Sequence, residues 1–308
     1  MHRTISAYII AAKRTALGRV GGLHRNRRIE SLTAPVLAAA LEDCNLPPER
    51  VDEIIIGNAT QGGNPARLIA LAAGLPESAA ALTIDRQCAS GLDAIVTACR
   101  AVADGQADII AAGGAEAIST APWRIAKPKS LYQLPHFIGV EPTMIDESEE
   151  PHLYEASEEL SQRLNIAREQ QDAWAFRSHL KAENAREKRK FVGEIVPLRS
   201  APEEAKDQSA AAGAEPEYFS AEPPFLPPQG SLTPANTSAM HDGAAITIVV
   251  SEKVWDELGR PPALRLVASV SRGVPPDNEA GAPMEAMQKL YDHLEGFNPK
   301  DIACLLYT

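Results

Sequence analysis

Short apolar segments alternate with segments of helix length through residues 5–117. The apolar segments are rich in Ile, Val or Ala and span residues 5–12, 51–59, 81–85 and 108–112. Strands that are connected through helices pair in parallel, and helices cover both faces of such a sheet. The alternation therefore predicts an α/β fold around a parallel sheet.

Two of the connecting segments carry a helical pattern. In the first, Ser31 stands where it can cap a helix whose apolar face holds Val36, Leu37, Ala40 and Leu41. In the second, residues 89–103, apolar side chains recur at similar spacing from Leu92 to Val102. We expect this second segment to form a buried helix directly after the 81–85 strand.

The pattern changes after residue 118. Prolines and an acidic cluster at 146–150 interrupt the chain, which favours an excursion away from the sheet. Inside it we expect one amphipathic helix, from Arg168 to about Lys190, with Trp174, Phe176 and Leu180 on its apolar face. Residues 201–228 are expected to form a loop.

Sheet-like segments return near residue 244. Strands are expected at 244–250, 263–270 and 302–306, with helices at 252–258 and 283–294. The order from residue 263 onward resembles the order at the start of the chain, which indicates a weak internal duplication. The second copy stops at Thr308, before the counterpart of the 89–103 helix.

Charge and cysteine content narrow the possible functions. A formal net charge of -11 argues against a surface that neutralises nucleic-acid phosphates. The four cysteines form no C-x-x-C pair and no cluster with histidine, so we expect free thiols in a reducing compartment and no metal site. No apolar run has the length of a signal peptide or a membrane span. We therefore expect a cytoplasmic protein without membrane association.

Cys88 lies at the expected junction between the 81–85 strand and the 89–103 helix. The unpaired N–H groups and the positive dipole end of a helix start stabilise a thiolate there. The small residues Ala89, Ser90 and Gly91 leave room for an acyl group. From the residues alone, Cys88 is either an activated nucleophile or a buried, inert cysteine, as expected for Cys44, Cys99 and Cys304.

The run around Cys88 resembles the thiolase family, which carries its acylated cysteine in an R-x-C-A-S-G-L motif like residues 86–92. The runs RTALG at 14–18, GGNPAR at 62–67, LAAGLP at 71–76 and GGAE at 113–116 resemble further family signatures in order and spacing. The helix at 168–179 and NTSAMHDGAA at 236–245 resemble two more. The last run departs from the family at Ala239, in place of glycine, and at His241, in place of asparagine.

The resemblance implies a five-layer α-β-α-β-α fold made of two similar halves, of which the second is incomplete here. It divides the chain into an N-terminal thiolase domain at 1–118 and 240–260, a CoA-binding loop domain at 119–239, and a partial C-terminal thiolase domain at 261–308. Asn64 and Arg67 fit subunit-interface or packing residues better than catalytic ones.

The resemblance also implies a function, that of an acetyl-CoA acetyltransferase or 3-ketoacyl-CoA thiolase. Its substrates would be acyl-CoA and coenzyme A, with no cofactor beyond the acyl-enzyme, and the chain would assemble into a homodimer or homotetramer. By position, Cys88 would be the acylated nucleophile, Ser238 would lie beside the pantetheine arm, and His152 with Leu153 would line the CoA tunnel. A turn residue at Ser238 and a solvated loop histidine at His152 are the alternatives.

Three motifs of the family are not found in the sequence: Asn-Glu-Ala-Phe, Gly-His-Pro and Cys-x-Gly-Gly. They supply the oxyanion support, the base and the second cysteine of a thiolase. We favour the hypothesis of a truncated or incompletely represented thiolase. A non-catalytic CoA-binding or oligomer-partner protein is the second hypothesis. A different condensing enzyme of the same fold, such as a ketoacyl synthase, is the third, although the NPAR and DGAA runs favour thiolase.

Overall fold

The computed structural model describes residues 6–128, 130, 132–138, 153–198, 205–208 and 215–294, together with residues 296, 298, 300 and 302. It divides into two compact units, each assembled from three stretches of chain. The first unit comprises Met1–Trp123, Ser178–Gly213 and Ser238–Val267. The second comprises Arg124–Arg177, Ala214–Thr237 and Ala268–Thr308.

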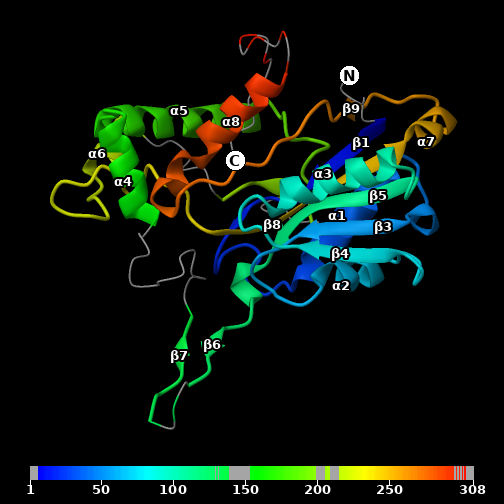
Figure 1. Cartoon of the computed structure of the whole chain (residues 1–308), viewed down its shortest axis with the longest axis horizontal. Helices are drawn as coiled ribbons and strands as arrows, with labels where there is room; N and C mark the ends of the chain where they lie inside the picture. The colour runs from blue at the N-terminus through cyan, green and yellow to red at the C-terminus, as the bar shows by residue number, and fades with distance from the viewer. Residues whose placement is uncertain are drawn as a thin grey trace. The chain divides into compact units, whose positions relative to one another are not determined.

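In the part of the chain that the structure describes, the first unit contains a seven-stranded sheet in the order β4-β3-β5-β8-β1-β9, with β2 paired to β8 (Figure 1). The strands β4, β3 and β5 pair in parallel, as predicted, whereas β8 runs antiparallel to both β5 and β1. The sheet is thus rich in parallel pairs but mixed, because the chain returns to it in the opposite direction after the long excursion. The strand bounds are β1 Ala7–Arg14, β2 Gly18–Arg19, β3 Glu53–Gly57, β4 Ala80–Ile84, β5 Ile109–Glu116, β8 His241–Ser251 and β9 Leu264–Arg265.

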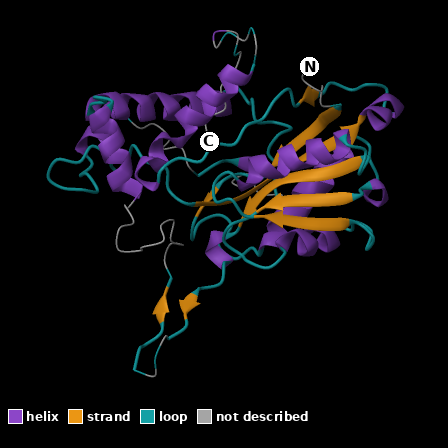
Figure 2. Cartoon of the chain, viewed as in Figure 1, coloured by secondary structure: helices purple, strands orange, loops and turns teal. Residues whose placement is uncertain are grey.

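Helices cover both faces of this sheet, which confirms the predicted α/β class (Figure 2). Successive strand side chains point to opposite faces, so Ile54 and Ile56 pack on the face that carries α1, α2 and α7, whereas Ile55 packs on the face that carries α3. The helix bounds are α1 Ile29–Asp43, α2 Pro65–Ala72, α3 Ser90–Ala103 and α7 Glu252–Glu257, and the short turns are η1 Pro48–Arg50 and η2 Ile118–Thr120.

The start of α1 differs from the prediction. The helix begins at Ile29 with Arg28 in the cap position, so Ser31 lies inside the first turn and caps nothing. The Ile29 side chain is buried in the core with Leu32, and burying it stabilises the fold by about 1.5–3 kcal/mol. A start at Ser31 would leave Ile29 outside the helix, and an ion pair between Arg28 and Glu30 at 2.8 Å accompanies the earlier start.

Residues 191–198 and 205–208 belong to the first unit, and Arg14 binds both stretches. The guanidinium of Arg14 donates to Glu194 at 2.5 Å and to both carboxylate oxygens of Asp207 at 2.8 and 3.1 Å. Ile195 adds a backbone bridge to Arg14. Arg14, the first residue of the RTALG run, therefore has a structural role through these ion pairs.

The second unit is mainly helical. Glu158 and Asp172 are buried in it, and both accept hydrogen bonds: Glu158 accepts from the N–H of Ser231 at 2.9 Å, and Asp172 accepts from Arg168 at 2.7 Å and from Asn236 at 2.9 Å. Polar contacts therefore fix the turn before β8. The elements are β6 Ile125–Ala126, β7 His136–Phe137, α4 Leu153–Arg163, α5 Arg168–Glu187, α6 Pro216–Ala221, η5 Pro276–Gly281 and α8 Ala282–His293.

The amphipathic interpretation of α5 is wrong. Trp174 and Leu180 are 53% and 45% exposed, and the one residue of α5 that is buried is the charged Asp172. Phe176 makes the expected apolar contact, an edge contact with Phe219 at 5.8 Å between ring centroids. The helix is held by an ion pair and an aromatic contact rather than by an apolar stripe.

Two further expectations need correction. The predicted loop at 201–228 contains helix α6, because Phe219 is fully buried and anchors it. The predicted strand at 263–270 is strand only at β9, Leu264–Arg265, where it pairs with β1. The strand expected at 302–306 lies outside the described residues except for Ile302. Within the described part of the chain, no helix has both the length and the apolar character needed to cross a membrane.

Candidate functional site

Cys88 lies where β4 ends, at Ile84, and α3 begins, at Ser90, as the sequence predicts. Because β4, β3 and β5 are parallel, their carboxyl ends meet at one edge of the sheet, and Asp85, Asn58 and Glu116 lie there too. The first residues of β8 reach the same edge, since Gly243 pairs with Glu116. This edge is the place where an open α/β sheet offers a crevice for ligands.

The turn that carries Cys88 is tightly tied. Gln87 has a φ of 51°, in the left-handed region that side chains other than Gly rarely adopt. The Asp85 carboxylate accepts from the N–H of Gln87 at 3.0 Å. The Ser90 hydroxyl accepts from the N–H of Arg86 at 2.7 Å and donates to the carbonyl of Gln87 at 2.6 Å. These bonds hold an unusual backbone conformation immediately before the thiol.

The start of α3 approaches the sheet more closely than a side chain would allow. A Cβ on Gly57 would lie 2.3 Å from the carbonyl carbon of Ser90, so only glycine fits at the end of β3. The nearest atom to a Cβ on Gly91 would be the Cα of Gly114, at 3.6 Å. Helix α3, which follows Cys88, is therefore held at a fixed distance from β3 and β5.

The described cysteines differ sharply in their surroundings. Cys88 is exposed, Cys44 is half-buried and Cys99 is buried. Burial raises the pKa of the Cys44 thiol and of the Cys99 thiol to about 11 each. Cys304 lies outside the described residues. The thiols of Cys44 and Cys99 fit the inert role that the sequence predicts for them, and Cys88 has the access that a nucleophile needs.

Sequence reasoning missed a polar network at this edge. Asn58 is 3% exposed, and its amide nitrogen donates to the carbonyl of Ala115 at 2.8 Å and to Glu116 at 3.0 Å. Glu116 also accepts from the N–H of Ala59 at 2.6 Å and from the Thr60 hydroxyl. Burial raises the pKa of Glu116, these hydrogen bonds oppose the shift, and the nearby carboxylate of Asp85 adds to it. The available signal was a polar residue at the carboxyl end of each of two apolar strands, Asn58 directly after β3 and Glu116 as the last residue of β5.

The predicted CoA-binding residues lie in different parts of the molecule. Ser238 is exposed, belongs to the first unit and precedes β8 by three residues; its hydroxyl donates to the carbonyl of Ala239 at 3.3 Å. Leu153 begins α4 in the second unit and is 52% exposed. His152 lies outside the described residues. The Nδ1 of His241 lies 2.6 Å from the carbonyl of Ala239, and the buried Nε2 has no partner among the described residues.

Asn64 and Arg67, from the GGNPAR run, bind the free edge of β4. Backbone groups alternate in direction along a strand, and the N–H of Ala80 bonds toward β3, so the carbonyls of Ala79 and Ala81 point away from the sheet. Arg67 donates to Ala79 at 3.1 Å, and the amide of Asn64 donates to Ala81 at 3.0 Å. These side chains cover an edge that would otherwise present unpaired acceptors.

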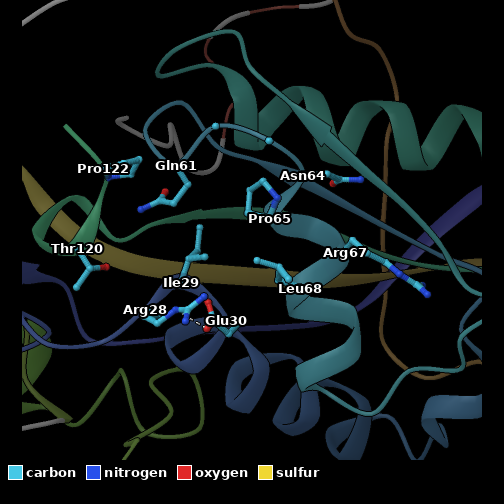
Figure 3. A pocket seen from close by; sticks show the side chains of 12 residues that line it. Arg28, Ile29, Glu30, Gln61, Asn64, Pro65, Arg67, Leu68, Thr120 and Pro122 are labelled. Carbon is cyan, nitrogen blue, oxygen red and sulfur yellow. Dashed lines mark ion pairs between the residues drawn. The ribbon is translucent and has the colours of Figure 1, made fainter. Parts of the chain in front are cut away.

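A cleft of about 580 Å³ lies beside α2 (Figure 3). Its lining includes Ile29 from α1, Leu68 from α2, and Gln61 from the loop between β3 and α2. Cys88 is not among its lining residues. Among the described residues, no three His, Cys, Asp or Glu side chains come together as a metal site.

Comparison with known proteins gives a consistent result. Residues 7–253 match the family model described as "Thiolase, N-terminal domain". The chain is 33% identical over 308 residues to the acetyl-CoA acetyltransferase of Allochromatium vinosum, covering 96% of this chain and 78% of that protein. It is 34% identical over 307 residues to the acetyl-CoA acetyltransferase of Cupriavidus necator, with coverage of 96% and 78%. The crystal structure of the Bacillus anthracis acetyl-CoA acetyltransferase superposes with a TM-score of 0.81 at 32% identity, covering 94% of this chain and 78% of that one.

Proposed function

The chain belongs to the thiolase family, and from this premise we propose that it is an acyl-CoA C-acyltransferase that carries its acyl group as a thioester on Cys88. In the synthetic direction, the Cys88 sulfur attacks the thioester carbonyl of acetyl-CoA. The carbon–sulfur bond to coenzyme A breaks, and the thiol proton of Cys88 ends on the departing coenzyme A thiol. A second acyl-CoA then gives up an α-proton to a base, and its α-carbon attacks the acyl carbon. The carbon–sulfur bond to Cys88 breaks, and the proton ends on the Cys88 sulfur, which restores the thiol. Thiolytic cleavage of a 3-ketoacyl-CoA is the reverse.

The exposed thiol at the start of α3 is the observation that supports this proposal most directly. The positive end of the helix dipole stabilises both a thiolate and the negative charge that develops on the attacked carbonyl. The hydrogen bonds at residues 85–90 hold the backbone on both sides of Cys88 before the substrate arrives, and preorganised geometry of this kind lowers the barrier to acyl transfer. Free Cys44 and Cys99 in addition favour a reducing compartment such as the cytoplasm.

Coenzyme A binding is assigned by family position to Ser238, His152 and Leu153. Ser238 shares a unit with Cys88 and is exposed, so its hydroxyl is accessible to a pantetheine amide. Leu153 is exposed at the start of α4, so its apolar side chain is accessible to a ligand. Coenzyme A and acyl-CoA act here as substrates, and no other cofactor is proposed.

Assembly into a homodimer or homotetramer is part of the proposal. The sheet has a free edge at β4, and Leu82 on β4 and Leu68 and Leu71 on α2 are exposed. Apolar side chains around a free edge favour contact with a second copy of the chain. Light scattering after size exclusion should therefore give the mass of a dimer or tetramer, and a monomer at micromolar concentration would contradict the assembly.

Acetylation of Cys88 tests the enzymatic proposal. Incubation with acetyl-CoA, followed by peptide mass spectrometry, should find one acetyl group on the Cys88 peptide and release an equal amount of coenzyme A. The Cys88→Ser variant should release no coenzyme A. The matched control is Cys44→Ser, which changes a half-buried thiol that bonds to the carbonyl of Ala40 and should leave the reaction unchanged. Binding of acetyl-CoA without any acetylation would favour a non-catalytic CoA-binding protein.

A further inference from the structure

The network around Asn58 and Glu116 joins three strand ends at the edge that carries Cys88. The N–H of Asn58 donates to the carbonyl of Ile84, the last residue of β4, at 3.0 Å. Its amide nitrogen donates to the carbonyl of Ala115 and to the carboxylate of Glu116, at the end of β5. Asn58 itself follows the end of β3. One buried residue, through its backbone N–H and its side-chain amide, thus ties β4, β3 and β5 together one residue before the Cys88 turn begins.

Glu116 extends this connection to the loop that follows β3. Its carboxylate accepts hydrogen bonds from the N–H of Ala59 and from the hydroxyl of Thr60, besides the amide of Asn58. Gln61 completes the set, because its backbone N–H donates to the side-chain Oδ1 of Asn58 at 3.0 Å and its side-chain amide donates to the carbonyl of Ala117 at 2.8 Å. Because the Glu116 carboxylate accepts this many hydrogen bonds, it attaches the loop after β3 to β5 and does not face a ligand.

The position of the Cys88 turn above the sheet depends on residues that the network around Asn58 and Glu116 holds in place. The turn starts from Ile84, whose carbonyl Asn58 holds, and it ends at Ser90, which rests on Gly57 immediately before Asn58. The network lies among the strand ends that carry the turn, and it contacts neither the thiol nor any group that reacts. A change in the network would therefore move the sulfur without removing a reacting group.

From this geometry, and on the premise that Cys88 is acylated, we infer that Asn58 and Glu116 are positioning residues that hold the Cys88 turn in register for acyl transfer. Acyl transfer requires the sulfur and the backbone donors around the attacked carbonyl in fixed relation, and a displacement of about 1 Å lowers such a rate by about 100-fold. Alkylation by a small reagent requires only an accessible thiolate. Comparing acylation with alkylation of Cys88 therefore distinguishes a change in the position of the sulfur from a change in its accessibility.

The test compares three variants with a matched control. Glu116→Gln keeps the size of the side chain and weakens its acceptors, whereas Asn58→Asp places a second carboxylate beside Glu116. The double variant Asn58→Asp/Glu116→Gln restores one amide–carboxylate pair with the donor and the acceptor exchanged. Glu53→Gln is the control, because Glu53 is a partly buried glutamate whose pKa burial also raises, but it lies at the opposite end of β3.

Two acyl donors and one alkylating reagent are used on each protein, with the Cys88 peptide followed by mass spectrometry. Acetyl-CoA reports the full reaction, p-nitrophenyl acetate reports acyl transfer without CoA binding, and iodoacetamide reports access. We expect Glu116→Gln and Asn58→Asp to slow acylation by both donors by about 10- to 100-fold. Alkylation should change by less than about 3-fold, and the double variant should recover about 10-fold relative to Asn58→Asp, as coupled residues in one network do.

Unchanged acylation in Glu116→Gln and Asn58→Asp would overturn the inference. So would equal losses of acylation and alkylation, or the appearance of iodoacetamide label on Cys99, because these would indicate loss of the fold rather than of position. Acylation of the wild type by p-nitrophenyl acetate but not by acetyl-CoA would refute the proposed function alone, and the comparison of variants with the small ester would still decide the role of Asn58 and Glu116.

Discussion

The two compact units are held together by different interactions. In the first, alternate residues of β3 and β5 fill two apolar cores, one on each face of the sheet. In the second, the buried residues include Glu158 and Asp172, and each carboxylate is bound by donors from the turn before β8 or from α5. An apolar core leaves a repeating pattern in the sequence, whereas a set of specific hydrogen bonds does not. This difference explains why the core strands of the first unit were predictable, whereas in the second unit the sequence predicted helices α5 and α8 but not the buried polar contacts.

The largest effect should follow from a cavity in the first unit. Ile55→Ala removes a side chain that is 1% exposed and packs with Cys99, so the free energy of unfolding should fall by about 2–5 kcal/mol. Urea denaturation measures the loss, and faster alkylation of Cys99 reports the same core opening. Leu82→Ala, on an exposed side chain of β4 in the same sheet, is the control. A loss of similar size at Leu82 would mean that burial does not distinguish these positions.

A smaller but clear effect should follow from breaking the polar set of the second unit. Asp172→Asn removes the charge that pairs with Arg168 and weakens the bond to Asn236, so unfolding should become easier by about 1–3 kcal/mol. The matched control is Asp256→Asn, which breaks an exposed ion pair with Arg260 at the same spacing of four residues and should leave the urea midpoint unchanged. Equal losses of stability in Asp172→Asn and Asp256→Asn would show that the buried polar contacts of the second unit contribute no more than an exposed ion pair.

Alkaline pH should weaken the first unit through its buried thiols. Burial raises the pKa of Cys44 and Cys99 from 9.0 to about 11, so deprotonation above pH 9 favours the unfolded chain. Their contribution to stability is complete below pH 9 and is lost as pH rises to 11, by about 1–2 kcal/mol for partly screened groups. Urea titrations at pH 8 and pH 11 measure the loss. A double Cys44→Ser/Cys99→Ser variant should show a smaller drop, and an identical drop would contradict the assignment.

The smallest effect is expected at Gly91, near the start of α3. A methyl group there would make only ordinary contact, since its nearest neighbour lies 3.6 Å away, and alanine favours a helix over glycine. Gly91→Ala should therefore raise the free energy of unfolding by about 0.5 kcal/mol. Thermal unfolding checks the sign. A decrease of the melting temperature would show that the space between α3 and the sheet is too small for the added methyl group.

The sequence was sufficient to predict those elements in which buried residues recur at regular intervals. The segments at 51–59, 81–85 and 108–112 correspond to β3, β4 and β5, and the junction at Cys88 followed from the strand and helix on either side. The cap at Ser31 was wrong because Ile29 gains more from burial than the chain gains from a serine cap. Asn58 and Glu116 were missed because their importance arises from three strand ends that meet only in the folded sheet. The local signal, a polar residue at the end of each strand, does not show which strand ends are neighbours in the folded sheet.

The position of β8 in the sheet also sets the order in which the protein can assemble. It lies between β5 and β1, yet it follows β5 in the chain by the whole excursion from η2 to the turn at Asn236. During synthesis on the ribosome, β1 emerges first, but it acquires its long antiparallel partner only when residues 241–251 have left the exit tunnel. Contacts of such long sequence separation form slowly, and unpaired strands are prone to aggregate while they wait. The nascent chain is therefore a candidate client for chaperones until β8 is inserted.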